Sequence, residues 1–388
     1  MGVKRIFISD IHMGDARSLT APHPYVWFNN NVSHLANFLN ELLKAPDVKE
    51  VIILGDLFDQ WIIPANRSPI PKLETICSSN IYAPVIDGLK ALAASQHIKL
   101  TYVPGNHDMA ISPADIPETR QFFEDSFQGM NFICEDTMPL GIYKNGIIVA
   151  EHGNRYGLFN SPDILSNSGA SFLPLGYFIS RLDTYKVCER GCPHSFWDIL
   201  FKFGKELMEG NTDFVEDVFL STAQDCGLGD GSIDVNGLPG YDDQATLPIA
   251  DIANRFSQIA TNWGQIPGTE NIPALEAAEN DQLSLFPAAK AVYFQGDSQF
   301  KVVIFGHTHN AEMQPIYKNP GNPNFIQNKD EPFRAVYANS GTWIDDTKHG
   351  CTYVETEEDG NRLYVRVKGY PSQRVIDNCE GFVEIQAD

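Results

Sequence analysis

The sequence is poor in positive charge and contains no long apolar run. It has 28 lysine and arginine residues against 50 aspartate and glutamate residues, a formal net charge of −22. The molecule as a whole therefore repels nucleic acid, and no basic run supplies a local binding patch. No window holds about 18 consecutive apolar residues, so we expect no transmembrane helix. The opening MGVKRIFISD lacks the apolar stretch of a signal peptide, and we expect a cytoplasmic protein.

The cysteines do not form a recognisable framework. There are seven of them, an odd number scattered along the chain, which argues against a set of structural disulfides. Cys188 and Cys192 could be half of a zinc site, but the sequence offers no second close pair. The glycine- and aspartate-rich stretch 226–243 lacks the ligand spacing of a calcium loop and is interpreted as a solvated loop.

Apolar runs and helical patterns alternate over the first 154 residues, which predicts an α/β arrangement. Three buried strands are expected at 5–9, 50–54 and 98–104, helices at 32–45 and 85–95, and a hairpin within 141–153. Each expected strand is followed at once by polar residues. Sites of α/β proteins are assembled at such strand ends.

The alternation of apolar runs and helical patterns does not continue between residues 155 and 299. This segment contains helical patterns and the loop 226–243, so we expect a mostly helical insertion. Strand-like runs return afterwards and are expected to complete a second sheet, at 333–341, 351–356 and 362–370.

The stretch FGHTHN, residues 305–310, places two histidines one residue apart directly after an apolar run. Residues i and i+2 of an extended chain face the same side, so His307 and His309 can direct two imidazoles into one small volume. Such an arrangement suits a metal ion. Taken alone, the motif could equally be a solvated turn that happens to contain two histidines.

Similar polar residues follow the other apolar runs. They are Asp10, His12, Asp56, Asp59, Asn106, His107, Asp108, His152, His307 and His309. Each has a simpler explanation on its own: GDLFD could be a turn with a helix cap, GNHD a turn, and His152 a half-buried core histidine. Chance poorly explains their joint appearance in this order.

This series resembles that of the calcineurin-like metallophosphoesterases, whose motifs D-x-H, G-D-x-x-D, G-N-H-[DE], H and G-H-x-H are all present. The resemblance implies an α/β fold, a four-layer α-β-β-α sandwich with a two-metal site at one edge. It also implies one catalytic domain, residues 1–154 and 300–388, interrupted by the mostly helical insertion 155–299 as a lid or cap.

The resemblance assigns roles to individual residues. It implies that Asp10, His12 and His309 hold one divalent metal ion, that Asn106, His152 and His307 hold a second, and that Asp56 bridges them. His107 would act as general acid or stabilise the transition state, oriented by Asp108, although a purely structural hydrogen bond is its plain alternative. Asp59 is expected to fix a ligand. Nitrogen and oxygen donors without thiolate suit manganese, iron or zinc, and we favour manganese.

Two such ions can clamp a phosphoryl group and activate a hydroxide for attack on phosphorus. We therefore predict a hydrolase acting on a phosphoester or pyrophosphate bond of a small phosphorylated substrate, and the motifs do not separate monoesterase from diesterase action. Two alternatives remain. A nuclease of the same fold is disfavoured by the charge of −22. A non-catalytic scaffold is disfavoured because every ligand position is filled.

GDLFDQW, SDIHMG and NSGTW look most like the branch that contains the UDP-2,3-diacylglucosamine hydrolases. His107 stands where that enzyme commonly has arginine, and the insertion here is longer. Candidate substrate contacts are Arg155, Asn339 and Thr342. The apolar segment 171–182, near Arg181, could form a lid over an apolar substrate tail or simply pack the insertion onto the sandwich. The oligomeric state is left open.

Overall fold

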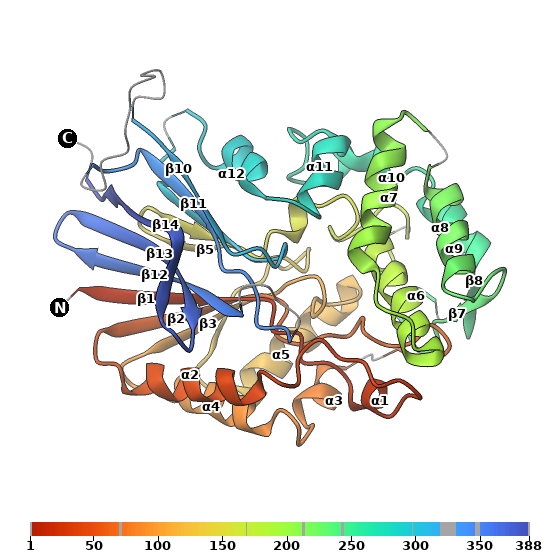
Figure 1. The fold of residues 1–388 in the computed structure, drawn as a ribbon, viewed down its shortest axis with the longest axis horizontal. Coiled ribbons are helices and arrows are strands. Elements are labelled where there is room, and N and C mark those ends of the chain that lie inside the picture. Colours follow the sequence, from red (N-terminus) through yellow and green to blue (C-terminus); the bar gives the residue numbers. More distant parts are fainter. Residues whose placement is uncertain are drawn as a thin grey trace.

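The computed structural model describes residues 2–69, 72–167, 169–211, 214–241, 244–296, 298–318, 331–345 and 350–386. Two β-sheets pack face to face and helices cover their outer faces, which confirms the expected α/β sandwich (Figure 1). The first sheet has the order β14-β13-β12-β1-β2-β3-β4, and the second has the order β10-β11-β9-β6-β5.

The strands of the first sheet are β1 (Val3–Ile8), β2 (Val48–Leu54), β3 (Lys99–Val103), β4 (Asn131–Phe132), β12 (Cys351–Asp359), β13 (Arg362–Tyr370) and β14 (Arg374–Glu384). Those of the second are β5 (Tyr143–Asn145), β6 (Ile148–Ala150), β9 (Val302–Phe305), β10 (Glu312–Ile316) and β11 (Ala335–Asn339). The helices before the insertion are α1 (Ala16–Leu19), α2 (Val32–Lys44), α3 (Leu73–Cys77), α4 (Ala83–Ala93) and α5 (Ile116–Ser126), with short 3-10 turns η1 (Pro113–Asp115) and η2 (Asn154–Tyr156).

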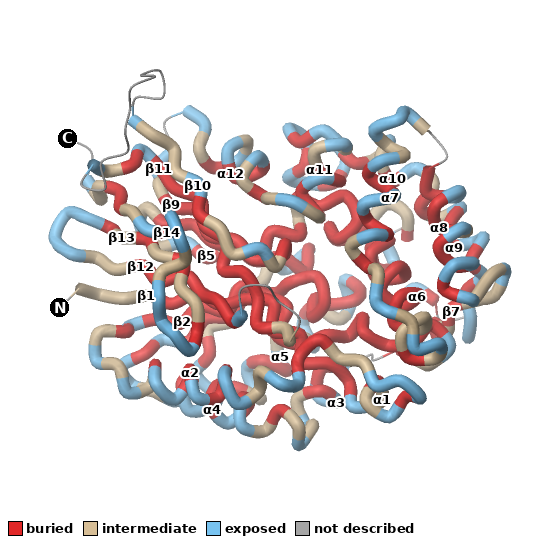
Figure 2. Tube along the Cα trace, viewed as in Figure 1, coloured by how far each residue is buried: buried red, intermediate tan, exposed pale blue. Residues whose placement is uncertain are grey.

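The alternation of side chains along β1 explains the layering. Ile6 and Ile8 belong to the core beneath α2 and α4, whereas Phe7 belongs to the core between the two sheets. Successive residues of a strand point to opposite faces, so a strand covered on both sides must be apolar throughout. Helix α2 meets this face with Leu35, Leu39 and other residues spaced three and four apart. Figure 2 shows the resulting buried central strands.

The runs 351–356 and 362–370, expected in a second sheet, belong instead to the first. Strand β12 pairs antiparallel with β1, and Phe7 lies opposite Val354. This pairing covers the edge of β1, which would otherwise present unpaired backbone groups. It also directs Val354 and Val365 into the core between the sheets. Only β11, from the run 333–341, joins the second sheet, where it pairs with β9.

The insertion consists mainly of helices that gather beside the two sheets, on the right in Figure 1. Its elements are α6 (Leu175–Arg190), α7 (Phe196–Met208), α8 (Phe214–Asp225), β7 (Ser232–Asp234), β8 (Thr246–Pro248), α9 (Ile249–Phe256), α10 (Ile259–Asn262), η3 (Trp263–Gln265), α11 (Ala274–Asn280) and α12 (Phe286–Val292). The stretch expected to be a loop thus contributes β7 to a small hairpin. None of the helices in the described ranges has the length and hydropathy needed to cross a bilayer.

The apolar segment 171–182 packs the insertion onto the sandwich. Arg181 is fully buried in this segment, and its guanidinium donates to carbonyl oxygens that include those of Ile63 and Arg67, at 2.8 and 2.6 Å. These carbonyls lie in the loop that follows β2. The segment therefore ties the insertion to the sandwich, as the plainer of the two interpretations expects.

Candidate metal centre

The loops that follow five strands meet at one edge of the sandwich. The backbone joins them directly: the amide of His12 donates to the carbonyl of Asp56 at 2.8 Å, and the amide of Gly306 donates to the carbonyl of His152 at 2.9 Å. Parallel strands end at the same sheet edge, which is why motifs far apart in sequence converge here. All the predicted ligands except His309 are buried, and the side chain of His309 is 9% exposed.

The backbone at this edge is strained. Seven non-glycine residues of the described ranges have left-handed φ angles, and five of them are predicted ligands: Asp10, His12, Asp56, His307 and His309. Such conformations cost free energy and cluster where function requires a side chain to be aimed. Glycine is required close by, because a Cβ atom at Gly105 would overlap the carboxylate of Asp56 and one at Gly306 would overlap Ser9 and Asp10.

One side of the cluster consists of Asp10, His12 and His309. Nε2 of His309 lies 3.1 Å from Nε2 of His12 and 3.2 Å from Oδ1 of Asp10. Donor atoms around one ion, with bonds of about 2.1 Å, lie roughly 3 to 3.4 Å apart. Oδ1 of Asp10 is buried and accepts no hydrogen bond from the described residues. These three side chains could therefore hold a cation.

The other side contains His152, Asn106 and His307. Nε2 of His152 lies 3.0 Å from Oδ1 of Asn106 and 3.2 Å from Oδ2 of Asp56. The same Asp56 oxygen lies 3.6 Å from Nε2 of His12, so this carboxylate faces both sides of the cluster. The ring of His307 lies 5.2 Å from that of His152, centroid to centroid. The structure thus brings all seven predicted ligands together.

The electrostatics favour a bound cation. Burial would raise the pKa of Asp56, but the neighbouring imidazoles of His152 and His107 outweigh burial and hold it well below its usual value. Burial would lower the pKa of His152, yet the charge of Asp56 raises it to about 9. Burial, aided by the positive charge of His107, lowers the pKa of His12. Ionised carboxylates and neutral imidazoles are the forms that bind metal, so Asp56 and His12 are in the binding form, whereas His152 must release a proton when an ion binds.

Asp59 connects His12 to His107. Its Oδ2 lies 2.8 Å from Nδ1 of His12 and 3.0 Å from Nδ1 of His107, while its Oδ1 accepts the backbone amides of Trp61 and Ile62. One oxygen therefore shapes the turn, and the other orients His12 through a hydrogen bond and lies within ion-pair distance of His107. The ring of His107 also stacks on that of Trp61 at 4.2 Å. Burial lowers the pKa of His107, but the charges of Asp59 and Asp56 more than compensate and raise it.

The expected pairing of His107 with Asp108 is wrong. The Asp108 carboxylate accepts the amides of Leu57, Phe58 and Gly105 at 2.8 to 3.1 Å and the hydroxyl of Tyr102. These contacts hold the loops after β2 and β3 together, so the carboxylate of Asp108 stabilises the turns and does not orient an imidazole. Asp59 takes the position beside His107.

The three predicted substrate contacts have different surroundings in the structure. Arg155 is paired with Glu135 at 2.7 Å and with Glu151 at 3.4 Å, so its guanidinium is already neutralised and not directed at the cluster. Asn339 is fully buried and donates to the carbonyl of Gly306 at 2.6 Å, which makes it a support of the loop that carries His307. Thr342 donates to the carbonyl of Asp10 at 2.8 Å and lines a cavity beside His309.

That cavity, of about 480 Å³, opens beside His309 and between the sandwich and the insertion. The insertion contributes Trp197, Phe201 and Leu283 to its wall, and the sandwich contributes Thr308 and Thr342 among others. Two of the apolar side chains are unusually exposed, Phe201 at 59% and Leu283 at 63%.

The sequence analysis did not single out two tryptophans that lie beside the predicted histidine ligands. The ring of Trp197 lies 5.5 Å from that of His309, and Trp27 lies 4.7 Å from His12 and 5.6 Å from His309. Neither tryptophan belongs to a motif or follows an apolar run, so no local pattern singles it out.

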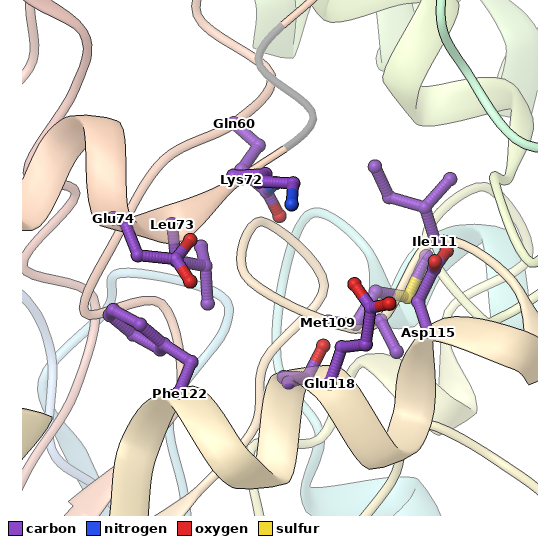
Figure 3. A pocket seen from close by; sticks show the side chains of 11 residues that line it. Gln60, Lys72, Leu73, Glu74, Met109, Ile111, Asp115, Glu118 and Phe122 are labelled. Atoms are coloured by element: carbon purple, nitrogen blue, oxygen red, sulfur yellow. The ribbon is translucent and has the colours of Figure 1, made fainter. Parts of the chain in front are cut away.

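A much smaller hollow, of about 50 Å³, lies between α3 and α5 and is lined by Lys72, Glu118 and other residues (Figure 3). None of the predicted ligands lines it.

Comparisons with solved structures give distant likenesses. The chain is similar to a dimetal phosphatase from Danio rerio, with 12% identity over 99% of both chains and a TM-score of 0.40. It is also similar to a predicted phosphoesterase from Streptococcus pneumoniae (10% identity, 99% and 98% of the two chains, TM-score 0.28) and to vacuolar protein sorting 29 from Cryptosporidium parvum (11%, 99% and 97%, TM-score 0.31). TM-scores this low carry no argument about this chain.

Comparison with curated proteins found no match. The family model for calcineurin-like phosphoesterases matches residues 3–202, just over half of the chain. The matched range begins in β1 and ends within α7, so it includes the loops that carry Asp10, Asp56, Asn106 and His152. The chain therefore belongs to the calcineurin-like phosphoesterase family.

Proposed function

We propose that this chain is a hydrolase that uses two divalent metal ions to cleave a phosphoester or pyrophosphate bond of a small substrate. One observation carries the proposal: Oδ2 of Asp56 lies 3.6 Å from Nε2 of His12 and 3.2 Å from Nε2 of His152, between two groups of nitrogen and oxygen donors. A carboxylate in that position can serve both groups. The membership of the phosphoesterase family supports the same reading.

Each group supplies nitrogen and oxygen donors for one ion. We assign Asp10, His12 and His309 to the first ion, and the second to the set Asn106, His152 and His307, with Asp56 shared. Oδ1 of Asp10, which is buried and lies 3.2 Å from Nε2 of His309 without a hydrogen bond from the described residues, supports the first assignment. When bound, the ions would supply Lewis acidity toward the phosphoryl group and lower the pKa of water. The donor set suits manganese, iron or zinc, and we choose manganese.

His107 is proposed to protonate the leaving oxygen. Its Nδ1 faces Asp59, which leaves Nε2 to carry the proton toward the substrate. The raised pKa keeps a larger fraction of the imidazole protonated at neutral pH, as a general acid requires. Stacking on Trp61 holds the ring plane in place. Asp59 therefore supports both the acid and the metal ligand His12.

The substrate is proposed to carry an apolar or aromatic group. The cavity beside His309 has Trp197, Phe201 and Leu283 on one wall, and exposed apolar side chains that gather at one place are typical of binding surfaces. The apolar wall comes from α7 and the segment after α11, not from 171–182. Such a substrate also agrees with the motif resemblance to the UDP-2,3-diacylglucosamine hydrolase branch. Nucleic acid is disfavoured by the charge of −22.

The proposal is tested by removing the metal with chelator, restoring manganese, and measuring initial rates on a chromogenic phosphomonoester and the matching phosphodiester. We expect a manganese-dependent rate on at least one of them, abolished by chelator. The ratio of the two rates then assigns the enzyme as a monoesterase or a diesterase. Absence of hydrolysis on these and on apolar-tailed esters, in protein shown to hold two manganese ions, would contradict the proposal and favour a binding scaffold.

A further inference from the structure

A carboxylate of the insertion reaches the candidate metal centre. Asp281 follows directly after α11 and is fully buried. Its Oδ1 lies 3.2 Å from Nε2 of His307, a predicted ligand that comes from the loop after β9. No motif contains Asp281, and the sequence analysis did not single it out.

The carboxylate is held firmly on its other sides. Its Oδ2 accepts the amide of Phe159 at 2.7 Å, and its Oδ1 accepts the side-chain amide of Asn160 at 2.8 Å. Gly157 approaches so closely that a Cβ atom there would overlap the carboxylate. These contacts place Asp281 against the segment that follows His152. The carboxylate therefore has one position in which it can meet His307.

Two of the predicted histidine ligands, His12 and His152, show a common pattern, whereas Nδ1 of His309 has no hydrogen-bond partner among the described residues. His12 has Nε2 in the cluster and Nδ1 on Asp59, and His152 has Nε2 in the cluster and Nδ1 2.7 Å from the carbonyl of Leu54. Metal-binding histidines regularly donate their second N–H to a carboxylate or carbonyl, which fixes the tautomer and the ring plane. His307 follows the pattern with the ring nitrogens exchanged, because its Nε2 faces Asp281.

We propose that Asp281 is a positioning residue for the second metal ion. It holds the proton on Nε2 of His307 and so leaves the lone pair of Nδ1 for the ion. This inference rests on the proposed function, which makes His307 a ligand. It also gives the insertion a part in the metal centre itself, since a carboxylate outside the sandwich completes the support of a ligand inside it.

The test is manganese binding by the full chain and its Asp281→Asn variant. We expect the variant to bind one manganese ion as the wild type does and the second about 10- to 100-fold more weakly. Binding is measured by equilibrium dialysis with elemental analysis, and electron paramagnetic resonance reports loss of the coupled two-manganese signal at limiting metal. Both readouts are independent of turnover.

Asn280→Ala is the matched control. Asn280 is also fully buried at the end of α11, and its side chain donates to the carbonyl of Tyr156 at 3.0 Å; within the described part of the chain it makes no hydrogen bond to a predicted ligand. This variant should lose thermal stability but retain two manganese ions. Equal weakening of the second ion in both variants would overturn the proposal, because the effect would then come from a loosened α11. Wild-type affinity in Asp281→Asn would overturn it as well.

A measurement on the wild type covers the case in which Asp281→Asn does not fold. Nitrogen-detected spectra of the protein loaded with diamagnetic zinc should show His307 protonated on Nε2, and protonation on Nδ1 would overturn the proposal. Failure of the proposed function looks different. A wild-type chain that binds fewer than two divalent ions would contradict the dinuclear centre before any variant is compared.

Discussion

Two predicted histidine ligands, one on each side of the candidate metal centre, are supported by different parts of the molecule. On the first side, the remote nitrogen of His12 rests on Asp59, which belongs to the same sandwich loop as Asp56. On the second side, the remote nitrogen of His307 rests on Asp281, which belongs to the insertion. The sandwich thus supports His12 and also His152, through the carbonyl of Leu54, whereas His307 takes its support from a residue of 155–299. The comparison shows that the insertion contacts one predicted ligand directly and also lines the cavity beside the cluster.

The largest expected effect comes from the residue that the two sides share. Asp56→Asn should lower kcat at least about a thousandfold, which corresponds to about 4 kcal/mol, because it weakens both ion sites at once. The measurement is the manganese-dependent rate together with metal content. Asp87→Asn, an exposed carboxylate on α4, is the control and should behave as the wild type. A variant that keeps either ion at wild-type affinity would show that Asp56 is not shared.

Asp59→Asn should weaken the first ion about 10- to 100-fold and leave the second nearly unchanged, because the support of His12 is lost. This is the counterpart of the change expected for Asp281→Asn, and the two variants together test whether the sides are separable. The measurement is manganese affinity in equilibrium dialysis. Equal weakening of both ions by either variant would show a single cooperative site in place of two supported separately.

His107→Ala should lower kcat at least about tenfold while both ions stay bound, because the imidazole is proposed to act on the leaving group and not on the metal. In the wild type the protonated form is the active one, so the rate should fall as the pH rises through the pKa of His107. Burial lowers that pKa, but the charges of Asp59 and Asp56 raise it above the usual value of about 6.5.

The pH–rate profile checks this prediction. The alkaline limb assigned to His107 should be missing from the variant. An unchanged rate in the variant would rule out acid catalysis by His107 and leave it the purely structural role.

Phe201→Ser should have the smallest effect, a rise in KM of about threefold to tenfold for an ester with an aromatic or acyl tail. Phe201 lines the cavity, whereas Met208 of the same helix is similarly exposed, at 52%, and does not. Met208→Ser is therefore the matched control and should leave KM unchanged. An equal rise in KM for esters with and without a tail would place the apolar group of the substrate elsewhere.

Features that depend on a local sequence pattern could be predicted from the sequence. Features that depend on contacts between distant segments could not. A cluster of polar residues could be predicted because each follows an apolar run and strand ends of an α/β sheet converge, and the resemblance to the calcineurin-like family then implied which of them are ligands. Asp59 and Asp108 both follow such runs, and only the fold decides that Asp59 faces His107 while Asp108 binds backbone amides. The runs that became β12 and β13 have the alternation of any half-buried strand, which does not say which sheet they join.

No local sequence pattern indicated that a residue of the insertion contacts a predicted ligand. Asp281 directly follows the helix α11, in a stretch without a motif. It comes to contact His307 only because the end of α11 packs against the loop after β9. Trp27 and Trp197 are similar cases, since each becomes part of the site through packing against His309. Contacts between distant segments cannot be deduced from the periodicity of either segment.

Anomalous diffraction at the manganese edge, from crystals of the full chain grown with manganese, tests the central claim most directly. The account predicts two peaks on opposite sides of the Asp56 carboxylate, separated by about 3.5 to 4 Å. One should contact Asp10, His12 and His309, and the other should contact Asn106 and His152 with Nδ1 of His307. A single peak, or two peaks away from Asp56, would contradict it.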